Sequence, residues 1–251
     1  MSAGGPAEFD RFARDYGAGF DDPLKRLVGP DARAFLRPKL DLLRRAAARR
    51  PGGANAPLAF LDFGCGSGDF LALIAEAGLP WQLEGCEVSA GMLAEADRRW
   101  PTLAARSRRW LVGTGPFPED RYDLISAVCV LHHVPPAEWA DTLARLGRAL
   151  RPGGILCLFE HNPWNPVTRW MVSRTEIDAD AHLLSPRTGR RLMEAAGLAA
   201  VRVRHFLFVP PSWPGARAVD RMLGWWPLGG QYLALGERRD SDCAAPDARV
   251  T

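Results

Sequence analysis

The stretch LDFGCGSGDF, residues 61–70, joins an apolar segment to a turn that holds three glycines within five residues. They are Gly64, Gly66 and Gly68. Glycine permits positive φ and lets a ligand approach the backbone closely. A helix that starts after the turn presents free N–H groups to an anionic group. Three explanations are open at this point: a bound phosphate, a bound nucleoside, or packing against a neighbouring helix of the same chain.

The spacing of these glycines argues against a dinucleotide. A GxGxxG fingerprint that starts at Gly64 would have its third glycine at position 69, where this chain has Asp69. Asp69 at the mouth of the helix and Asp62 before the turn both oppose a pyrophosphate. We therefore expect a ligand that carries a cationic end and a small carboxylate.

Strand-like and helix-like segments alternate outward from this turn. The expected strands are residues 58–63, 82–87, 109–112, 122–129, 154–160, 200–209 and 231–236. The expected helices are residues 31–50, 69–77, 90–99 with Ser89 as its cap, 136–150 and 185–196, with a Trp-rich helical stretch between the last two strands. Such alternation predicts an α/β fold with a doubly wound sheet of seven strands and helices on both faces.

Changes of composition divide the chain. We expect residues 1–57 to form an N-terminal helical segment that acts as a lid, and residues 58–239 to form the main domain. Residues 161–184 carry proline and tryptophan without a clean repeat, which indicates an insertion that caps one end of the sheet over the substrate. Residues 240–251 are polar and proline-bearing, and are expected to be a flexible tail.

Composition is that of an ordinary globular protein, with 47% hydrophobic and 24% charged residues and a formal net charge of +3. The chain has neither a secretory signal nor an apolar run long enough for a membrane span, so we expect a cytoplasmic protein with no membrane contact. Basic and acidic residues are mixed, which does not indicate a nucleic-acid partner. The five cysteines form no CxxC pair, so we predict neither disulfides nor a metal site.

Ligands of doubly wound sheets bind outside the carboxyl ends of the strands. Glu87 ends the second expected strand, 19 residues after Gly68. An acid at a strand end can merely start the next helix, but at this distance from a glycine turn it can accept hydrogen bonds from both hydroxyls of a ribose.

Four ordered motifs now resemble those of class I S-adenosylmethionine-dependent methyltransferases. They are LDFGCGSGDF, GCEVSAGML, RYDLISAVCVLHHV and LRPGGILCLFEHNP, and they cover roughly residues 58–160. GGQYLALGER resembles the end of the same Rossmann-like fold, whose last strand is antiparallel. FDRFARDYGAGFDD and EHNPWNP resemble a subgroup that acts on small molecules.

The resemblance implies S-adenosylmethionine as cofactor and assigns the residues that contact it. On the methionine side these are Asp62 near the amino group, Gly64, Cys65, Gly66 and Gly68 in the turn, and Val128, Cys129 and His133. On the nucleoside side they are Glu87 on the ribose, Val88 and Met92 over the adenine, and Thr114 and Gly115 at its border. Many members have an Asp after the third strand, where this chain reads LVGTGPFPED, so Thr114 or a backbone carbonyl must accept from the adenine amino group.

Candidate bases for the acceptor lie near the ends of the fourth and fifth strands. His161 is the first choice because it follows the fifth strand directly, and the others are His132, His133 and Glu160. Tyr16, in the N-terminal segment, is a further catalytic candidate as a lid or acceptor contact. For each of them a structural role is the alternative: a loop or cofactor-wall histidine, a strand-end acid, or ordinary packing. The acids of the insertion, Glu176, Asp178 and Asp180, are expected to form a solvated turn.

The predicted activity is methyl transfer to an O, N or C nucleophile of a small organic molecule, in specialised or glycan-related metabolism. Five tryptophans, Trp164, Trp170, Trp213, Trp225 and Trp226, are expected to pack in the core and lid. Alternatives for them are an apolar or aromatic acceptor pocket and a lipid-facing stretch. Two rival functions are a nicotinamide-dependent oxidoreductase, which the absent third glycine disfavours, and a non-catalytic binding or scaffold protein. The oligomeric state is not predicted.

Overall fold

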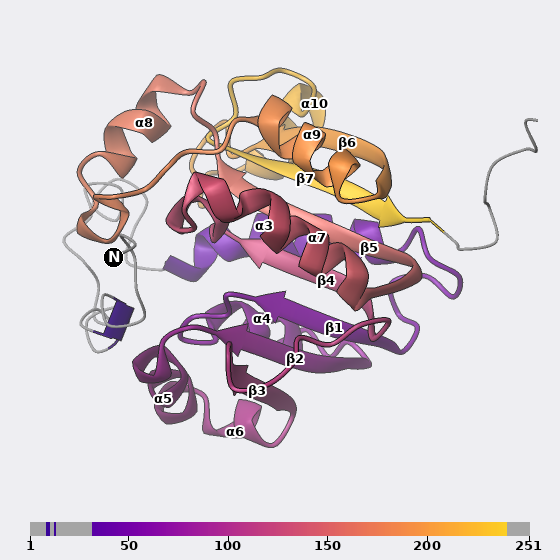
Figure 1. The fold of residues 1–251 in the computed structure, drawn as a ribbon. Helices are drawn as coiled ribbons and strands as arrows, with labels where there is room; N and C mark the ends of the chain where they lie inside the picture. The colour runs from indigo at the N-terminus through magenta and orange to yellow at the C-terminus, as the bar shows by residue number, and fades with distance from the viewer. Residues whose placement is uncertain (1–8, 11–12, 14–31, 240–251) are drawn as a thin grey trace, which may run out of the picture.

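The computed structural model describes residues 9–10, 13 and 32–239, and their centre is one seven-stranded sheet, which Figure 1 shows from one side. The strands are β1 Leu58–Phe63, β2 Trp81–Glu87, β3 Ser107–Leu111, β4 Tyr122–Val128, β5 Leu150–His161, β6 Leu198–Phe206 and β7 Gln231–Arg238. Their order in the sheet is β3-β2-β1-β4-β5-β7-β6. The pairs from β3 to β5 are parallel, whereas β7 is antiparallel to both β5 and β6. This confirms the predicted Rossmann-like, doubly wound sheet with an antiparallel last strand.

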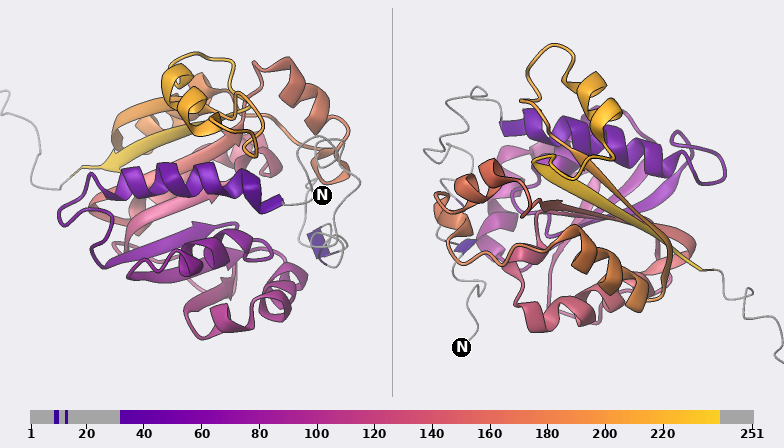
Figure 2. Two further views of the ribbon diagram at one scale, coloured as in Figure 1. Left: turned by 180° about the vertical axis from the view of Figure 1, so that it is seen from behind. Right: turned by 90° about the horizontal axis from the view of Figure 1, so that it is seen from above.

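Helices cover both faces of the sheet. The α-helices are α3 Leu36–Ala47, α4 Asp69–Glu76, α5 Ala90–Arg99, α6 Pro101–Ala104, α7 Trp139–Ala149, α8 Pro166–Val172, α9 Pro186–Ala195 and α10 Ala216–Leu223. The 3-10 helices are η1 Ala32–Phe35, η2 Leu131–His133, η3 Pro136–Glu138 and η4 Glu176–Asp178. Helices α3 and α10 lie on one face, and α7 and α9 on the other (Figure 2). None of the helices in the described residues is long and apolar enough to cross a lipid bilayer.

The core consists of one apolar layer on each side of the sheet. Leu43 of α3 and Ile74 of α4 pack with Phe60 on one side, and Leu146 of α7 packs with Ile125 on the other. All five side chains are 0% exposed, and burial of each contributes about 1.5–3 kcal/mol. Because α3 shares its core with β1, the residues from 36 to 47 pack with the main domain, and the domain boundary at position 57 stays a prediction.

The helix starts follow local sequence chemistry. Ser89 caps α5 as predicted, accepting the amide of Met92 at 3.0 Å. Ser185 caps α9 in the same way, accepting the amide of Thr188 at 3.1 Å. Asn165 caps α8, a helix that the sequence analysis did not predict, because the insertion shows no helical repeat.

Other differences arise where packing overrides the local pattern. Strand β5 begins at Leu150, four residues before the expected 154, because the RPGG segment stays in the sheet as an irregularity in the β4–β5 register. The predicted packing of the tryptophans in the core is wrong. All five named above are exposed, from 38% for Trp164 to 78% for Trp225.

Candidate active site

The glycine turn after β1 has two structural glycines and one that faces open space. All three have positive φ, +71° at Gly64, +51° at Gly66 and +76° at Gly68. A Cβ on Gly64 would lie 2.6 Å from Cγ2 of Val130, and one on Gly68 would lie 3.2 Å from Cβ of Ala96. A Cβ on Gly66 would meet no atom within 4 Å. The packing of the chain itself therefore requires Gly64 and Gly68, while Gly66 leaves room for a ligand.

Glu87, at the end of β2, holds its carboxylate against this turn. The amide of Gly66 donates to Oε2 at 2.9 Å, and the amides of Val88 and Ser89 donate to Oε1 at 2.8 and 3.1 Å. The side chain is 8% exposed. Three of about four acceptor positions of a carboxylate are thus taken. Oε2 has one acceptor position left for a ribose hydroxyl. To accept from a second hydroxyl, the carboxylate would have to lose the hydrogen bond from one of the three backbone amides.

Asp62 is the second acid beneath the turn, and it is 2% exposed. The hydroxyl of Ser126 donates to its Oδ1 at 2.6 Å. Burial raises the pKa of Asp62 to about 7, helped by the nearby charge of Glu87 and opposed by the Ser126 hydrogen bond. A cationic group placed beside Asp62 would favour its ionised form, as the amino group of an amino acid would.

Asp69 does not present a free charge to the ligand. Nη1 of Arg99 lies 2.9 Å from its Oδ2, and the hydroxyl of Ser67 donates to the same oxygen at 2.6 Å. The charge against a pyrophosphate therefore comes mainly from Asp62 and Glu87.

The expected nucleoside side lies at the ends of β2 and β3. Met92 is buried and Val88 is 39% exposed. The hydroxyl of Thr114 donates to the carbonyl of Leu111 at 2.7 Å, and Thr114 and Gly115 are exposed. The Thr114 oxygen keeps acceptor capacity, so its role toward an adenine amino group stays a prediction.

The N-terminal segment reaches this side of the site. Oδ1 of Asp10 accepts from the hydroxyl of Ser89 at 2.5 Å and from the amide of Gly91 at 2.9 Å. Ala13 packs with Met92, and the ring of Phe9 lies edge-on to His133 at 5.2 Å. Tyr16 lies outside the described residues, as does the tail 240–251.

The expected methionine side continues at the end of β4. Val128 is half-buried there, and Cys129 has a φ of +56°, which is uncommon for a residue with a side chain. The amide of Cys129 donates to the carbonyl of Phe159 at 2.8 Å, which ties the turn after β4 to β5. Cys65 lies in the glycine turn, is 7% exposed, and lies so close to Gly85 of β2 that a Cβ there would be 2.8 Å from its Sγ.

Glu160 and His132 form a buried pair between the ends of β4 and β5. Oε2 of Glu160 lies 2.6 Å from Nδ1 of His132, and the two side chains are 0% and 1% exposed. Oε1 of Glu160 accepts from the amides of Val130 and Leu131 at 3.1 and 2.8 Å. Burial opposes both charges, but the mutual attraction holds the pKa of His132 well above its usual value and lowers the pKa of Glu160. The pair is therefore an ion pair.

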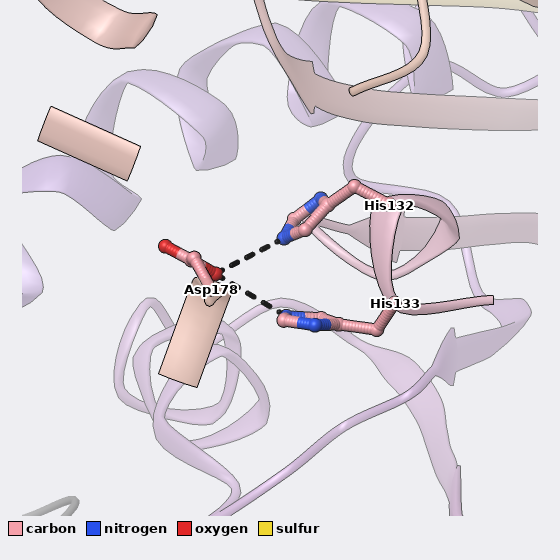
Figure 3. A group of neighbouring side chains, drawn as sticks. All are labelled: His132, His133 and Asp178. Atoms are coloured by element: carbon pink, nitrogen blue, oxygen red, sulfur yellow. Dashed lines mark ion pairs between the residues drawn. The ribbon is translucent and has the colours of Figure 1, made fainter. Parts of the chain in front are cut away.

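Asp178 of the insertion closes over this pair (Figure 3). Its Oδ1 lies 3.5 Å from Nε2 of His132 and 3.5 Å from Nε2 of His133. The side chain of Asp178 is 11% exposed. The predicted solvated turn is therefore wrong for this acid, because Asp178 faces two histidines. Glu176 and Asp180 are exposed, as expected.

His161 and His133 are both neutral near pH 7. Burial, together with the charge of His132, lowers the pKa of each to about 4. The ring of His161 lies 5.1 Å from that of His132, and its Nδ1 is 3.4 Å from Nε2 of Gln231. The structure thus brings together four of the five predicted catalytic candidates: His132, His133, Glu160 and His161.

Sequence reasoning named His132 as a candidate base but did not predict its pairing with Glu160 and Asp178, and it placed Asp178 in a solvated turn. His132 and Asp178 are 46 positions apart in the chain, and no motif spacing connects them. A signal for His132 existed in the doubled histidine that follows the buried strand. Asp178 had none, because the insertion that carries it has no periodic pattern from which its fold could be predicted.

Comparison with known proteins agrees with the resemblance of the sequence motifs to methyltransferases. Residues 60–154 match the family model described as "Methyltransferase domain". The chain is 31% identical over 165 residues to demethylmenaquinone methyltransferase of Beutenbergia cavernae, covering 64% of each chain. It is 36% identical over 122 residues to trans-aconitate 2-methyltransferase of Methylobacterium nodulans, covering 49% of this chain and 43% of that one. The chain thus matches less than two thirds of the length of these relatives.

Among solved structures, the chain is similar to a possible histamine N-methyltransferase from Thermotoga maritima. The TM-score is 0.60 at 17% identity, covering 93% of this chain and 99% of that one. At this identity the likeness concerns the fold.

Proposed function

Because the chain belongs to the class I S-adenosylmethionine-dependent methyltransferases, we propose that it transfers the methyl group of S-adenosylmethionine to a small organic molecule. The cofactor predicted from the motifs is confirmed as that of the family. The reaction is an in-line displacement: the nucleophile forms a bond to the methyl carbon as the bond to sulfur breaks, and S-adenosylhomocysteine leaves. The nucleophile is an O, N or C atom, and it loses its proton to a base where it carries one.

The observation that best supports this proposal is a contact between the expected cofactor turn and the histidine cluster near which we expect the methyl acceptor. Gly64 of the cofactor turn packs on Val130, whose amide is hydrogen-bonded to Glu160 of the buried histidine cluster. The expected methionine site and this cluster therefore both adjoin the backbone at Val130. Such placement suits a methyl group that must point from the donor to a nucleophile beside the histidines.

His161 is the base that we assign. Its imidazole is neutral and can accept a proton, and it begins the insertion that would cover the acceptor. Both oxygens of Glu160 are engaged, by His132 and two amides. We therefore assign Glu160 a positioning role.

The acceptor that we propose has an apolar or aromatic part. Phe9 and Ile177 pack against Met92, and Phe9 lies edge-on to His133, so an apolar wall runs from the expected adenine position to the histidines. By their names, the two relatives described above act on demethylmenaquinone and on trans-aconitate. A cyclic apolar quinol suits this wall better than a tricarboxylate does. A place in specialised or glycan-related metabolism stays a prediction.

Calorimetry and turnover test the proposal. The chain should bind S-adenosylmethionine and S-adenosylhomocysteine but not NADH, and it should release S-adenosylhomocysteine with a quinol, phenol, amine or carboxylate from an acceptor panel. Failure to bind either sulfur ligand would overturn the proposed cofactor site. Binding of both without turnover of any acceptor class would favour the non-catalytic alternative.

A further inference from the structure

Three side-chain atoms converge at the mouth of the insertion (Figure 3). Nε2 of His132, Nε2 of His133 and Oδ1 of Asp178 all lie within 4.8 Å of one another, and two of the three separations are 3.5 Å. An N–H···O hydrogen bond is about 2.7–3.2 Å long, so 3.5 Å is long for direct hydrogen bonding. Ligands held about 2.0–2.1 Å from a tetrahedral zinc ion lie about 3.4 Å apart. The 3.5 Å distances from Oδ1 of Asp178 to the two histidine nitrogens therefore fit a metal ion bound between these atoms better than direct hydrogen bonds.

The surroundings of His132 are those of a metal ligand. Its Nδ1 is fixed by Glu160 at 2.6 Å, which turns Nε2 toward Asp178. Glu160 is itself fixed by the amides of Val130 and Leu131. A carboxylate on the far nitrogen of a ligating histidine sets its tautomer and ring orientation, and increases its strength as a ligand.

We propose that His132, His133 and Asp178 bind a divalent transition-metal ion, with Zn²⁺ as the best fit, and that the metal displaces the proton on Nε2 of the His132 imidazolium. Two imidazoles and one carboxylate suit zinc, and three protein ligands leave a fourth position open, as in catalytic zinc sites. An oxygen or nitrogen of the acceptor can become the fourth ligand. The site has no CxxC or HxxxH motif in the sequence, because its ligands come from η2 and η4, which are far apart in the chain.

Metal titration of the full chain tests this site. Calorimetry with ZnCl₂ and visible absorption with Co²⁺ should each show one equivalent bound per chain, with a four-coordinate cobalt spectrum. Asp178→Asn and His133→Ala should reduce the affinity at least tenfold, and Glu160→Gln by about 10–100-fold through His132. Asp180→Asn is the matched control, since Asp180 is exposed and two positions from Asp178, and it should bind as the wild type does.

Far-UV circular dichroism and denaturant unfolding of the same variants show whether they are folded. If the wild type binds S-adenosylmethionine but no stoichiometric Zn²⁺ or Co²⁺, the metal site is overturned and the methyltransferase proposal stands. Equal metal affinity in wild type and Asp178→Asn overturns it as well.

An independent observation concerns the surface around α10. Five large apolar side chains are exposed on or beside this helix: Trp213 at 55%, Met222 at 73%, Trp225 at 78%, Trp226 at 43% and Leu228 at 39%. We call them the α10 patch. The patch is anchored to the site, because Nδ2 of Asn162, next to His161, donates to the carbonyls of Pro227 and Gly229 at 2.8 Å each.

A basic groove adjoins the patch and shares Trp225 with it. The groove has a volume of about 360 Å³ and is lined by four arginines, Arg45, Arg49, Arg202 and Arg204. Among the described residues, no acid forms an ion pair with any of the four. Arginine binds phosphate through several donors, and tryptophan prefers the interface between water and lipid.

We infer that the α10 patch and its groove dock on an anionic lipid bilayer, with tryptophans in the interface and a lipid phosphate in the groove. Vesicles of phosphatidylcholine mixed with phosphatidylglycerol should bind the full chain about tenfold more tightly than vesicles of phosphatidylcholine alone, and the difference should shrink in high salt. The double variant Trp225→Ala/Trp226→Ala and the variant Arg202→Glu should lose this binding. Arg108→Glu on β3, at the opposite edge of the sheet, is the matched control and should keep most of it.

Three outcomes overturn the docking surface. They are equal binding to both vesicle types, full competition by inorganic phosphate at physiological concentration, and a dimer in sedimentation that the tryptophan variant makes monomeric.

Discussion

Glu160 and His132 form an ion pair, 2.6 Å between Oε2 and Nδ1, in which neither side chain is more than 1% exposed. Removal of one partner of a buried pair leaves the other charge without compensation, which costs about 3–5 kcal/mol. Glu160→Ala should therefore lower the free energy of unfolding by that amount, because it also leaves the amides of Val130 and Leu131 without acceptors. Denaturant unfolding measures the change. Glu194→Ala, which breaks the exposed pair with Arg190, should change stability by less than about 1 kcal/mol, and an equal loss in both would contradict the role of burial.

Gly64 and Gly66 offer a matched pair of substitutions in the turn. Both have positive φ, so alanine brings strain of roughly 1–2 kcal/mol at either position. Gly64→Ala adds a clash, since its Cβ would lie 2.6 Å from Val130, whereas Gly66→Ala meets nothing within 4 Å. We expect Gly64→Ala to be the less stable protein in denaturant unfolding. Gly66→Ala should act mainly on S-adenosylmethionine affinity, and the reverse order would show that the open space at Gly66 is not the ligand site.

Glu87→Gln tests the ribose contact without a change of shape. The carboxylate accepts three backbone amides, and hydrogen bonds to a charged group contribute about 1.5–3 kcal/mol. The variant should bind S-adenosylmethionine and S-adenosylhomocysteine more weakly by about that amount, to the same extent for both, because the ribose is common to them. Calorimetry measures both affinities. Unchanged affinity for both would remove Glu87 from the site.

The sequence predicted the order of strands and the donor side well because both depend on local signals. Glycine spacing, the acid at the end of β2 and the period of the helices each lie within a few residues. The expected helix at 90–99 has its observed bounds, since Ser89 and Pro101 mark its ends.

The acceptor side could not be predicted in the same way. Asp178 reaches the histidines through an insertion whose path depends on Asn162, Asn165 and the loop from 227 to 230. The exposure of Trp225 likewise depends on what α10 leaves uncovered, which no local pattern records. Both features depend on contacts between segments far apart in the chain.

Asp62 makes cofactor binding depend on pH in a predictable direction. Its pKa in the free protein is raised to about 7, so it is mostly protonated at pH 6 and mostly ionised at pH 8. If the carboxylate holds the amino group of S-adenosylmethionine, affinity should be roughly tenfold weaker at pH 6 than at pH 8, the change expected across one pKa. Asp62→Asn should bind more weakly at pH 8 and lose most of this dependence. A parallel pH profile in the variant would assign the titration to another group.

The raised pKa of Asp62 has the opposite effect on the stability of the cofactor-free protein, which should fall as the pH rises. An acid whose folded pKa lies above its unfolded value of 3.8 stabilises the fold below that value, and the contribution is lost as pH rises through about 7. Denaturant unfolding of the free protein between pH 4 and 8 should show this loss for the wild type and a smaller one for Asp62→Asn.

His161 is expected to act on the chemical step alone. A positioned general base contributes about 10²–10⁴-fold to a rate, so His161→Gln should lower kcat for an acceptor that must lose a proton by a factor in that range. Affinity for S-adenosylmethionine should stay within twofold of the wild type, because the proposed cofactor contacts do not include His161. The matched control is His182→Gln, since His182 is also on the insertion but exposed. Should His161→Gln turn over at the wild-type rate, proximity without a base would suffice, and the role of His161 would be confined to its contact with Gln231.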